Sequence, residues 1–193
     1  MAWIETHETW LGPSAQDNNA LECYSFFSGK GWVIDAIAAI CGNMAIESSI
    51  NPDKTNSRSG AYGLTQWITH KQDMKDWCTA NGYSWASGVG QTNYIEWERL
   101  NPAAADQWYG RGDYVGMTFT DFAHNTRGYT VRELTHAFWR CYERSAEYQT
   151  ERETKALHFY ELFGGQPGPG GDFPKWLLFN RKRKWYWQGG DKY

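Results

Sequence analysis

The sequence contains no apolar run that approaches the length of a membrane span, and its first residues lack the basic start and apolar stretch of a secretion signal. Its net charge of -3 argues against general nucleic-acid binding. It has no Cys-x-x-Cys pair and no His-Glu-x-x-His pair, which are spacings that zinc sites use. We therefore expect a soluble chain with no secretion signal of its own, no nucleic-acid partner, no metal and no cofactor.

The sequence has few cysteines, and they lie far apart along the chain. The four cysteines are Cys23, Cys41, Cys78 and Cys141, and each falls in a stretch that reads as helix. Buried Cys packs as a small apolar residue, so we expect free buried thiols. A Cys-His amidase or peptidase using Cys41 or Cys78 is an alternative, but no strand pattern supplies a histidine facing either residue.

Apolar residues, by contrast, suffice for one sizeable core. They make up 41% of the 193 positions, with aromatics at 17%, so one domain plus an appendage is expected. Residues 164–171, GGQPGPGG, cannot sustain a helix or a central strand and are predicted to be a linker. The chain thus divides into a domain at 1–163, the linker at 164–171 and a basic, aromatic tail at 172–193.

The domain is predicted to be mainly α-helical. Patterns of Thr-x-x-Gln or Thr-x-x-Glu begin at Thr69, Thr130 and Thr150, and each precedes an apolar-periodic stretch, as at a helix start with a capping box. Periodicity predicts further helices at about 15–28, 32–48 and 90–100. Only residues 61–67, AYGLTQW, resemble a short strand. We expect a helical bundle around a central buried helix, with a short β or loop element beside it.

Glu47 occupies a position that the helix pattern reserves for an apolar residue. The preceding members of the same face are Val33, Ile37, Ile40 and Met44, at spacings of three and four. Pro52 disfavours helical geometry at the residue before it, so the helix must end soon after Glu47. Glu47 therefore lies in the last turn, where a buried stripe can open into a cleft.

Glu47 at this position is suited to acid catalysis. Partial burial removes hydration from a charged carboxylate, and the carbonyl end of a helix also disfavours negative charge. Both effects favour the protonated form, which a general acid requires near neutral pH. The alternative is that Glu47 extends into solvent or pairs with an arginine.

The residues after Glu47 have the composition of a saccharide subsite. Residues 51–60 are rich in turn formers and are expected to be an exposed loop. If AYGLTQW is extended, Tyr62 and Gln66 lie on one side and Gly63 and Trp67 on the other. Gly63 lacks a side chain, so another group can approach its main chain closely. Sugar rings stack on aromatic faces, and their hydroxyls need amide partners.

The order of these motifs resembles that of known wall-degrading enzymes. ESSINPDKTNSRSGAYGLTQ resembles the first two motifs of goose-type lysozymes and soluble lytic transglycosylases. More closely, GWVIDAIAAICGNMAIESSINP with GLTQW, and later MTFTDF and TVRELTHAFWRCYER, resembles the lysozyme-like cell-wall domain at the tail tip of small short-tailed phages. The resemblance extends over roughly Ala20 to Phe163.

The resemblance implies a lysozyme-like α+β fold whose loop element lines a saccharide cleft. It implies that Glu47 protonates the bridging oxygen between N-acetylmuramic acid and N-acetylglucosamine in peptidoglycan. The groove residues that it implies are Ser48, Tyr62, Gly63, Gln66 and Trp67. It also implies a protein of the phage virion tail, present in the host cytoplasm before release. The cations and aromatics of the tail at 172–193 themselves indicate a segment that docks on anionic wall polymers or other tail proteins, or the start of a further domain; the alternative is an end that packs back on the domain.

Two departures leave the chemistry open. Related tail lysins often have Tyr-Glu-Arg-Pro where this chain has Tyr142-Glu143-Arg144-Ser145, so we expect Tyr142 and Glu143 to be structural or auxiliary, with Glu143 in an ion pair or a helix-end contact rather than in catalysis. The Ala-Tyr-Asn motif of transglycosylases is not found. Asp53 is the nearest candidate for a second carboxylate, although one acid suffices in goose-type enzymes. A wall-binding or tail-structural module without turnover is the alternative function.

Loop aromatics are further candidates for contact with a glycan. Trp85, Trp108 and Tyr109 lie in predicted loops and would extend the groove, although loop aromatics also cover cores. Trp77, Trp97 and Trp139 have helical spacings from other apolar residues and are expected in the core.

Overall fold

The computed structural model describes residues 2–145 and 147–164, and in this part of the chain the fold is mainly α-helical, as predicted. The longer helices are α1 (Pro13–Gly29), α2 (Ile34–Ser48), α3 (Lys71–Ala80), α4 (Gly88–Leu100), α7 (Val131–Phe138) and α8 (Glu151–Leu162). Shorter ones are α5 (Pro102–Ala105), η1 (Gly112–Tyr114), α6 (Phe119–His124) and the π-helical η2 (Trp139–Glu143). The predicted linker beyond Gly164 and the tail at 172–193 lie outside the described residues.

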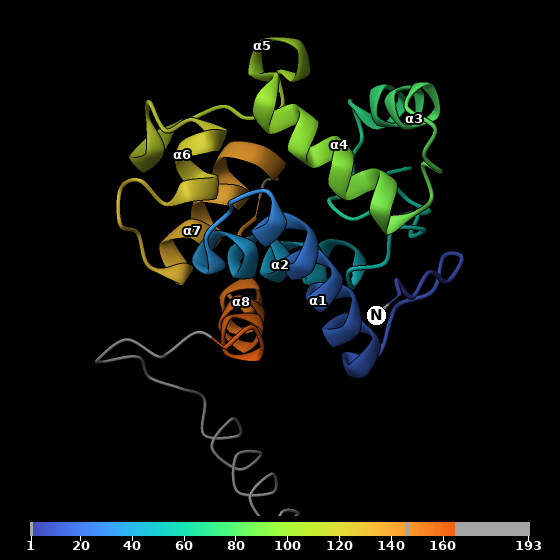
Figure 1. The fold of residues 1–193 in the computed structure, drawn as a ribbon, viewed down its shortest axis with the longest axis horizontal. Helices are drawn as coiled ribbons and strands as arrows, with labels where there is room; N and C mark the ends of the chain where they lie inside the picture. The colour runs from blue at the N-terminus through green and yellow to red at the C-terminus, as the bar shows by residue number, and fades with distance from the viewer. Residues whose placement is uncertain (1, 146, 165–193) are drawn as a thin grey trace, which may run out of the picture.

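Helix α2 is the centre of the fold, which confirms the predicted central helix. Residues 36–45 of α2 are all buried, because apolar side chains occupy nearly the whole circumference of the helix. Figure 1 shows α2 in the middle of the helical cluster, with α1, α7 and α8 packed around it. None of the described helices is long and apolar enough to cross a membrane.

A glycine allows α2 and α8 to approach each other closely. A Cβ atom added to Gly42 would lie 2.6 Å from the Cβ atom of Ala156 and 2.6 Å from the carbonyl oxygen of Arg152. No side chain larger than hydrogen fits at this crossing without a shift of the backbone. Gly42 therefore fixes the separation of the two helices one turn before Glu47.

The predicted capping boxes have three different outcomes. The box at Thr130 is confirmed, since its hydroxyl accepts from the Glu133 backbone amide and the Glu133 carboxylate accepts in return. Thr150 does precede α8, but its side chain makes no capping bond. The box at Thr69 is wrong, because α3 begins after His70.

The predicted strand at 61–67 is wrong. Tyr62 and Trp67 exchange backbone hydrogen bonds of 3.0 and 2.9 Å, and the residues between them form a tight turn. Gly63 and Gln66 have φ angles of 81° and 54°, which break the pleat and its alternation of faces. The expected β element is therefore reduced, among the described residues, to isolated bridges of Tyr62 with Thr55 and with Trp67.

Candidate active site

Glu47 lies in the last turn of α2, as predicted, and its side chain is 20% exposed. The chain leaves the helix through Ser49 and Ile50, both at φ 56°. One carboxylate oxygen of Glu47 accepts a short hydrogen bond from Nη2 of Arg152, which belongs to the first turn of α8. The arginine contact that is the alternative to a catalytic role is therefore present, while the side chain keeps partial exposure.

Arg152 is buried and its guanidinium joins three helical segments. Its side chain is only 2% exposed. Nη1 donates to Oε2 of Glu143 at 2.6 Å and to Oδ1 of Asn43 at 3.1 Å, and Nη2 donates to Oε1 of Gln149 at 3.3 Å. A cation in the first turn opposes the helix dipole, and a buried cation needs partners. The two carboxyl groups, Glu47 and Glu143, provide them.

Asn43 supports the cluster that Arg152 forms with Glu47 and Glu143. Its side-chain amide donates to the carbonyl oxygens of Ala39 and Thr135 at 2.9 and 3.0 Å, and its carbonyl accepts from Arg152. It therefore links α2 to both α7 and α8. In the stretch GNMAIES of α2, Gly42 permits the close helix crossing and Asn43 forms the polar link. Glu47 carries the partly exposed carboxylate.

Glu143 ends the π-helix that continues α7. Its side chain is 3% exposed and forms an ion pair with Arg152, as predicted. Burial first, and then the negative charge of Glu47, raise the pKa of Glu143 well above its ordinary value, and Arg152 offsets this only in part. Single π-helical turns within helices often occur at functional sites. Here the π-helical turn η2 ends at Glu143, whose carboxyl is the second one bound to Arg152.

The turn at 63–66 is held against the end of α2 by buried polar side chains. The hydroxyl of Ser48 is fully buried and donates to the Leu64 carbonyl at 2.9 Å. Gln91 of α4, which sequence reasoning missed, accepts from the Leu64 amide at 2.8 Å and donates to the Pro52 carbonyl at 2.7 Å. A Cβ atom at Gly63 would lie 2.6 Å from Gln91 Oε1. The group that approaches Gly63 closely is therefore Gln91.

Asp53 has partners of its own rather than joining the Glu47 cluster. Its Oδ1 accepts from the hydroxyl of Tyr62 at 2.7 Å, and its Oδ2 lies 3.0 Å from Nδ1 of His7. Tyr62 is 4% exposed, and its ring also packs edge-on against Trp85. The carboxyl that the structure places beside Glu47 is Glu143.

Trp67 contributes to a buried polar chain instead of an open platform. It is 3% exposed, and its indole donates to the hydroxyl of Tyr142 at 3.0 Å. Tyr142 in turn donates to Glu98 at 2.5 Å. Burial raises the pKa of Glu98 to about 8, which its hydrogen bonds only partly offset. Gln66 retains partial exposure, and its amide donates to the Gly63 carbonyl at 3.0 Å.

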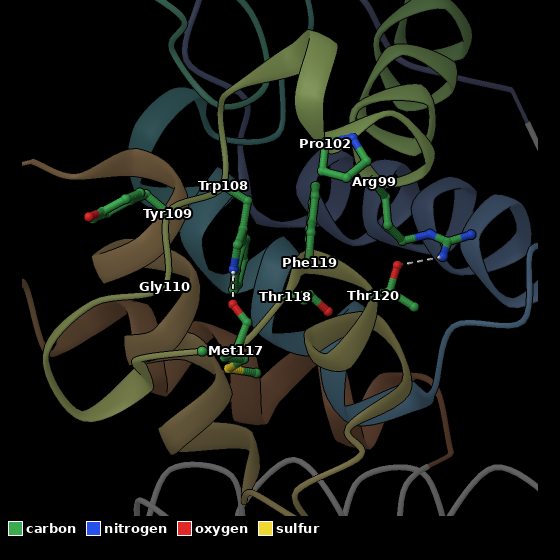
Figure 2. Close-up of a pocket in the computed structure, with 10 residues that line it drawn as sticks. Arg99, Pro102, Trp108, Tyr109, Gly110, Met117, Thr118, Phe119 and Thr120 are labelled. Atoms are coloured by element: carbon green, nitrogen blue, oxygen red, sulfur yellow. Dashed lines mark hydrogen bonds between the residues drawn. The ribbon is translucent and has the colours of Figure 1, made fainter.

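A pocket of about 300 Å³ lies between the end of α4, the 108–110 loop and the start of α6 (Figure 2). The indole of Trp108 donates to the Met117 carbonyl at 2.7 Å and stacks on Phe119. Tyr109 is 62% exposed, and its backbone amide donates to the carbonyl of Cys141 in the π-helix. The pocket does not include Glu47, but its loop is attached to the helix that carries Glu143.

The thiols do not form a nucleophilic site. All four cysteines are free and buried, as predicted. Burial raises the pKa of Cys78 to about 11. Burial first, and then the neighbouring Cys23, raise the pKa of Cys41 well above its ordinary value. Both effects oppose formation of a thiolate. No group of side chains that could hold a metal ion occurs among the described residues.

Comparison with known proteins finds similarity to phage proteins. The family model described as phage tail lysozyme matches residues 18–163. The chain is also 32% identical, over 159 residues, to morphogenesis protein 1 of Bacillus phage B103. That match covers 79% of this chain and 41% of the relative. The chain thus spans about two fifths of the length of this curated relative.

Proposed function

Since the chain belongs to the phage tail lysozyme family, we propose that it cleaves the β-1,4 bond between N-acetylmuramic acid and N-acetylglucosamine in peptidoglycan, with Glu47 as the catalytic acid. The observation that supports this role is the position of Glu47. It ends the central helix, is partly exposed, and backs onto a buried cluster of Arg152 and Glu143. Of these three ionisable side chains, Glu47 is the most exposed and is the one that we propose a glycan reaches.

Each group of the cluster has a separate task in this reaction. Protonated Glu47 donates to the bridging oxygen as the glycosidic bond breaks, and the electron pair of that bond stays on the oxygen. The new carboxylate is stabilised by the charged hydrogen bond from Arg152. Ser48 and Gln91 hold the neighbouring turn in place from inside the protein.

Replacement of Glu47 tests the assignment directly. Glu47→Gln keeps the shape of the side chain and its contact with Arg152 but removes the transferable proton. General acid catalysis contributes about 10²–10⁴-fold to a rate, so we expect the clearing of purified cell walls to fall by at least about 100-fold. Turbidity loss and zymography measure the activity, and circular dichroism checks the fold.

The matched control for this test is Glu153→Gln. Glu153 lies on α8 next to Arg152, but its carboxylate binds Arg132 and the hydroxyl of Tyr148. This variant is expected to retain wild-type clearing. Substantial muralytic activity in folded Glu47→Gln would refute the catalytic role. A wild-type protein that binds walls without clearing them would favour the non-catalytic wall-binding or tail-structural module.

The step that completes the reaction distinguishes a hydrolase from a lytic transglycosylase. Asp53 is the other carboxylate proposed from sequence, but both of its oxygens already have partners in Tyr62 and His7. We propose that water, or a hydroxyl of the muramic acid itself, attacks without a covalent carboxylate intermediate. Mass spectrometry of the released muropeptides separates these routes, because a 1,6-anhydro product is lighter by one water than a reducing end.

The wider biological setting is proposed from the family. We propose that the protein is part of a phage virion tail, is made in the host cytoplasm, and acts on the cell wall during entry. Tyr109 and the adjacent pocket supply an exposed aromatic surface for an outer sugar unit. Gln66 is the partly exposed amide of the predicted groove, and the tail at 172–193 is proposed to dock on wall polymers or other tail proteins.

A further inference from the structure

The cluster behind Glu47 contains one cation and two carboxyl groups. Arg152 donates from Nη2 to Glu47 and from Nη1 to Glu143, and its other hydrogen-bond partners are the neutral side chains of Asn43 and Gln149. Arg152 and Glu143 are 2% and 3% exposed, whereas Glu47 is 20% exposed. The cluster thus has an inner carboxyl, an outer carboxyl and one guanidinium that contacts both.

The charges of this cluster balance only when one proton is bound. Glu47 comes from α2, Glu143 from η2 and Arg152 from α8, and these are the charged groups that act on Glu143. The nearby carboxylate of Glu153 is directed to Arg132 and Tyr148. With both site carboxyls ionised, the buried cluster would carry one uncompensated negative charge, which is costly in a poorly hydrated site. A single proton shared by the two carboxyls makes the cluster neutral.

An unpartnered oxygen indicates where that proton is held. Oε1 of Glu143 is buried and receives no hydrogen bond from any described residue. The Glu143 carboxyl and the Glu47 carboxyl are bonded to the same guanidinium, through Nη1 and Nη2 of Arg152 respectively. Two ionised carboxylates cannot hydrogen-bond to each other, because both are acceptors. A proton between them gives the orphaned oxygen a partner.

We propose that Glu143 is a positioning residue that shares one proton with Glu47 near neutral pH, while Arg152 serves as the counter-ion of whichever carboxyl is ionised. This inference rests on the proposed role of Glu47 as the acid. In the reactive arrangement Glu143 is ionised and neutralises Arg152, which leaves Glu47 free to hold the proton.

The proton balance over one catalytic cycle closes without a further group. Glu47 gives its proton to the bridging oxygen as the carbon–oxygen bond breaks, and the positive charge that develops on the sugar offsets the second carboxylate at this stage. The attacking hydroxyl, of water or of the sugar, loses a proton as its own bond to carbon forms. That proton returns to Glu47 and restores the shared pair. Without Glu143, Arg152 would pair with Glu47 alone and hold it in the ionised form.

Glu143→Gln tests the inference through the dependence of activity on pH. The amide preserves shape and still accepts from Arg152, but it removes the second negative charge. The wall-clearing profile should move to lower pH, with activity at neutral pH falling about tenfold for each pH unit of the shift. Activity should return on acidification. Glu143→Asp should recover most of the wild-type profile, and Glu153→Gln should leave it unchanged.

A second measurement does not depend on turnover. Carbon-13 NMR of carboxyl-labelled glutamate follows the protonation of Glu47, whose signal is assigned by its loss in Glu47→Gln. The wild-type pair should retain one proton at neutral pH, and Glu143→Gln should ionise Glu47 there. An unchanged pH profile in a folded but slower Glu143→Gln, or a Glu47 signal that is ionised at neutral pH in both proteins, would overturn the shared proton. Failure of the wild type to clear walls would refute the proposed function instead, while the NMR titration would still decide the inference.

Discussion

Glu98 is a buried carboxyl whose protonation state affects the stability of the fold. It is 2% exposed, it accepts one hydrogen bond from Tyr142, and its Oε1 has no partner among the described residues. Burial raises its pKa from the ordinary 4.5 to about 8. Between these two values the unfolded chain releases the proton while the folded protein retains it. Stability contributed by protonated Glu98 is therefore complete below about pH 4.5 and is lost as the pH rises toward 8.

Glu98→Gln should remove this pH dependence. The neutral amide still accepts from Tyr142, so it mimics the protonated acid. We expect the free energy of unfolding to fall less steeply between about pH 5 and pH 8 than in the wild type, by up to ~1.4 kcal/mol per pH unit. Urea denaturation at several pH values measures the difference, with Glu161→Gln on the surface of α8 as the control. An identical slope in wild type and Glu98→Gln would show that Glu98 does not titrate in this range.

At the scale of elements, the site depends on how closely α2 and α8 pack. Gly42 permits the close crossing, and this crossing places Arg152 beside Glu47. Periodicity predicted where Glu47 lies along α2, because that pattern is local to one helix. Periodicity could not predict the contact with Arg152. This residue lies 105 positions later in the chain and contacts Glu47 only because α2 and α8 pack together. The one local signal is an arginine in the first turn of a helix, against the dipole.

Gly42→Ala should separate the two helices. The added methyl would contact backbone atoms of α8 at 2.6 Å, and overpacking of this kind costs typically about 1–3 kcal/mol. We expect lower stability by that amount, together with a loss of wall clearing as Arg152 moves away. Thermal unfolding and turbidity assays measure both effects.

The control for the helix crossing is Gly29→Ala. Gly29 ends α1, and a Cβ atom added there meets no atom within 4 Å. This variant should fold and act as the wild type does. Equal stability of Gly42→Ala and wild type would mean that the two helices can adjust without cost.

At the scale of the whole molecule, sequence predicted the helical class, the central helix and the burial of the thiols. These features follow from composition and from periodicity within single helices. Sequence did not predict the turn at 63–66, because its left-handed residue Gln66 is fixed by contacts with the rest of the fold. It also did not predict that Trp67 is buried, because the partner of its indole, Tyr142, is 75 residues away in the chain.

The four thiols report on the integrity of the whole fold. Cys23, Cys41, Cys78 and Cys141 lie in four different helical segments, and all are buried. Alkylating reagents should therefore leave the native protein unmodified and fully active, and should modify four thiols once urea unfolds it. Mass spectrometry counts the adducts. Rapid modification of the folded protein with loss of activity would instead favour a cysteine-dependent hydrolase.

The position of Arg152 late in the chain also affects when the site is completed. Glu47 is synthesised early, but its counter-ion belongs to the last described helix. A polypeptide still attached to the ribosome can already include the residues of α2 while it lacks the guanidinium that α8 supplies. Translation therefore assembles this ion cluster last, and a chain terminated between η2 and α8 would retain its acid without the cation beside it.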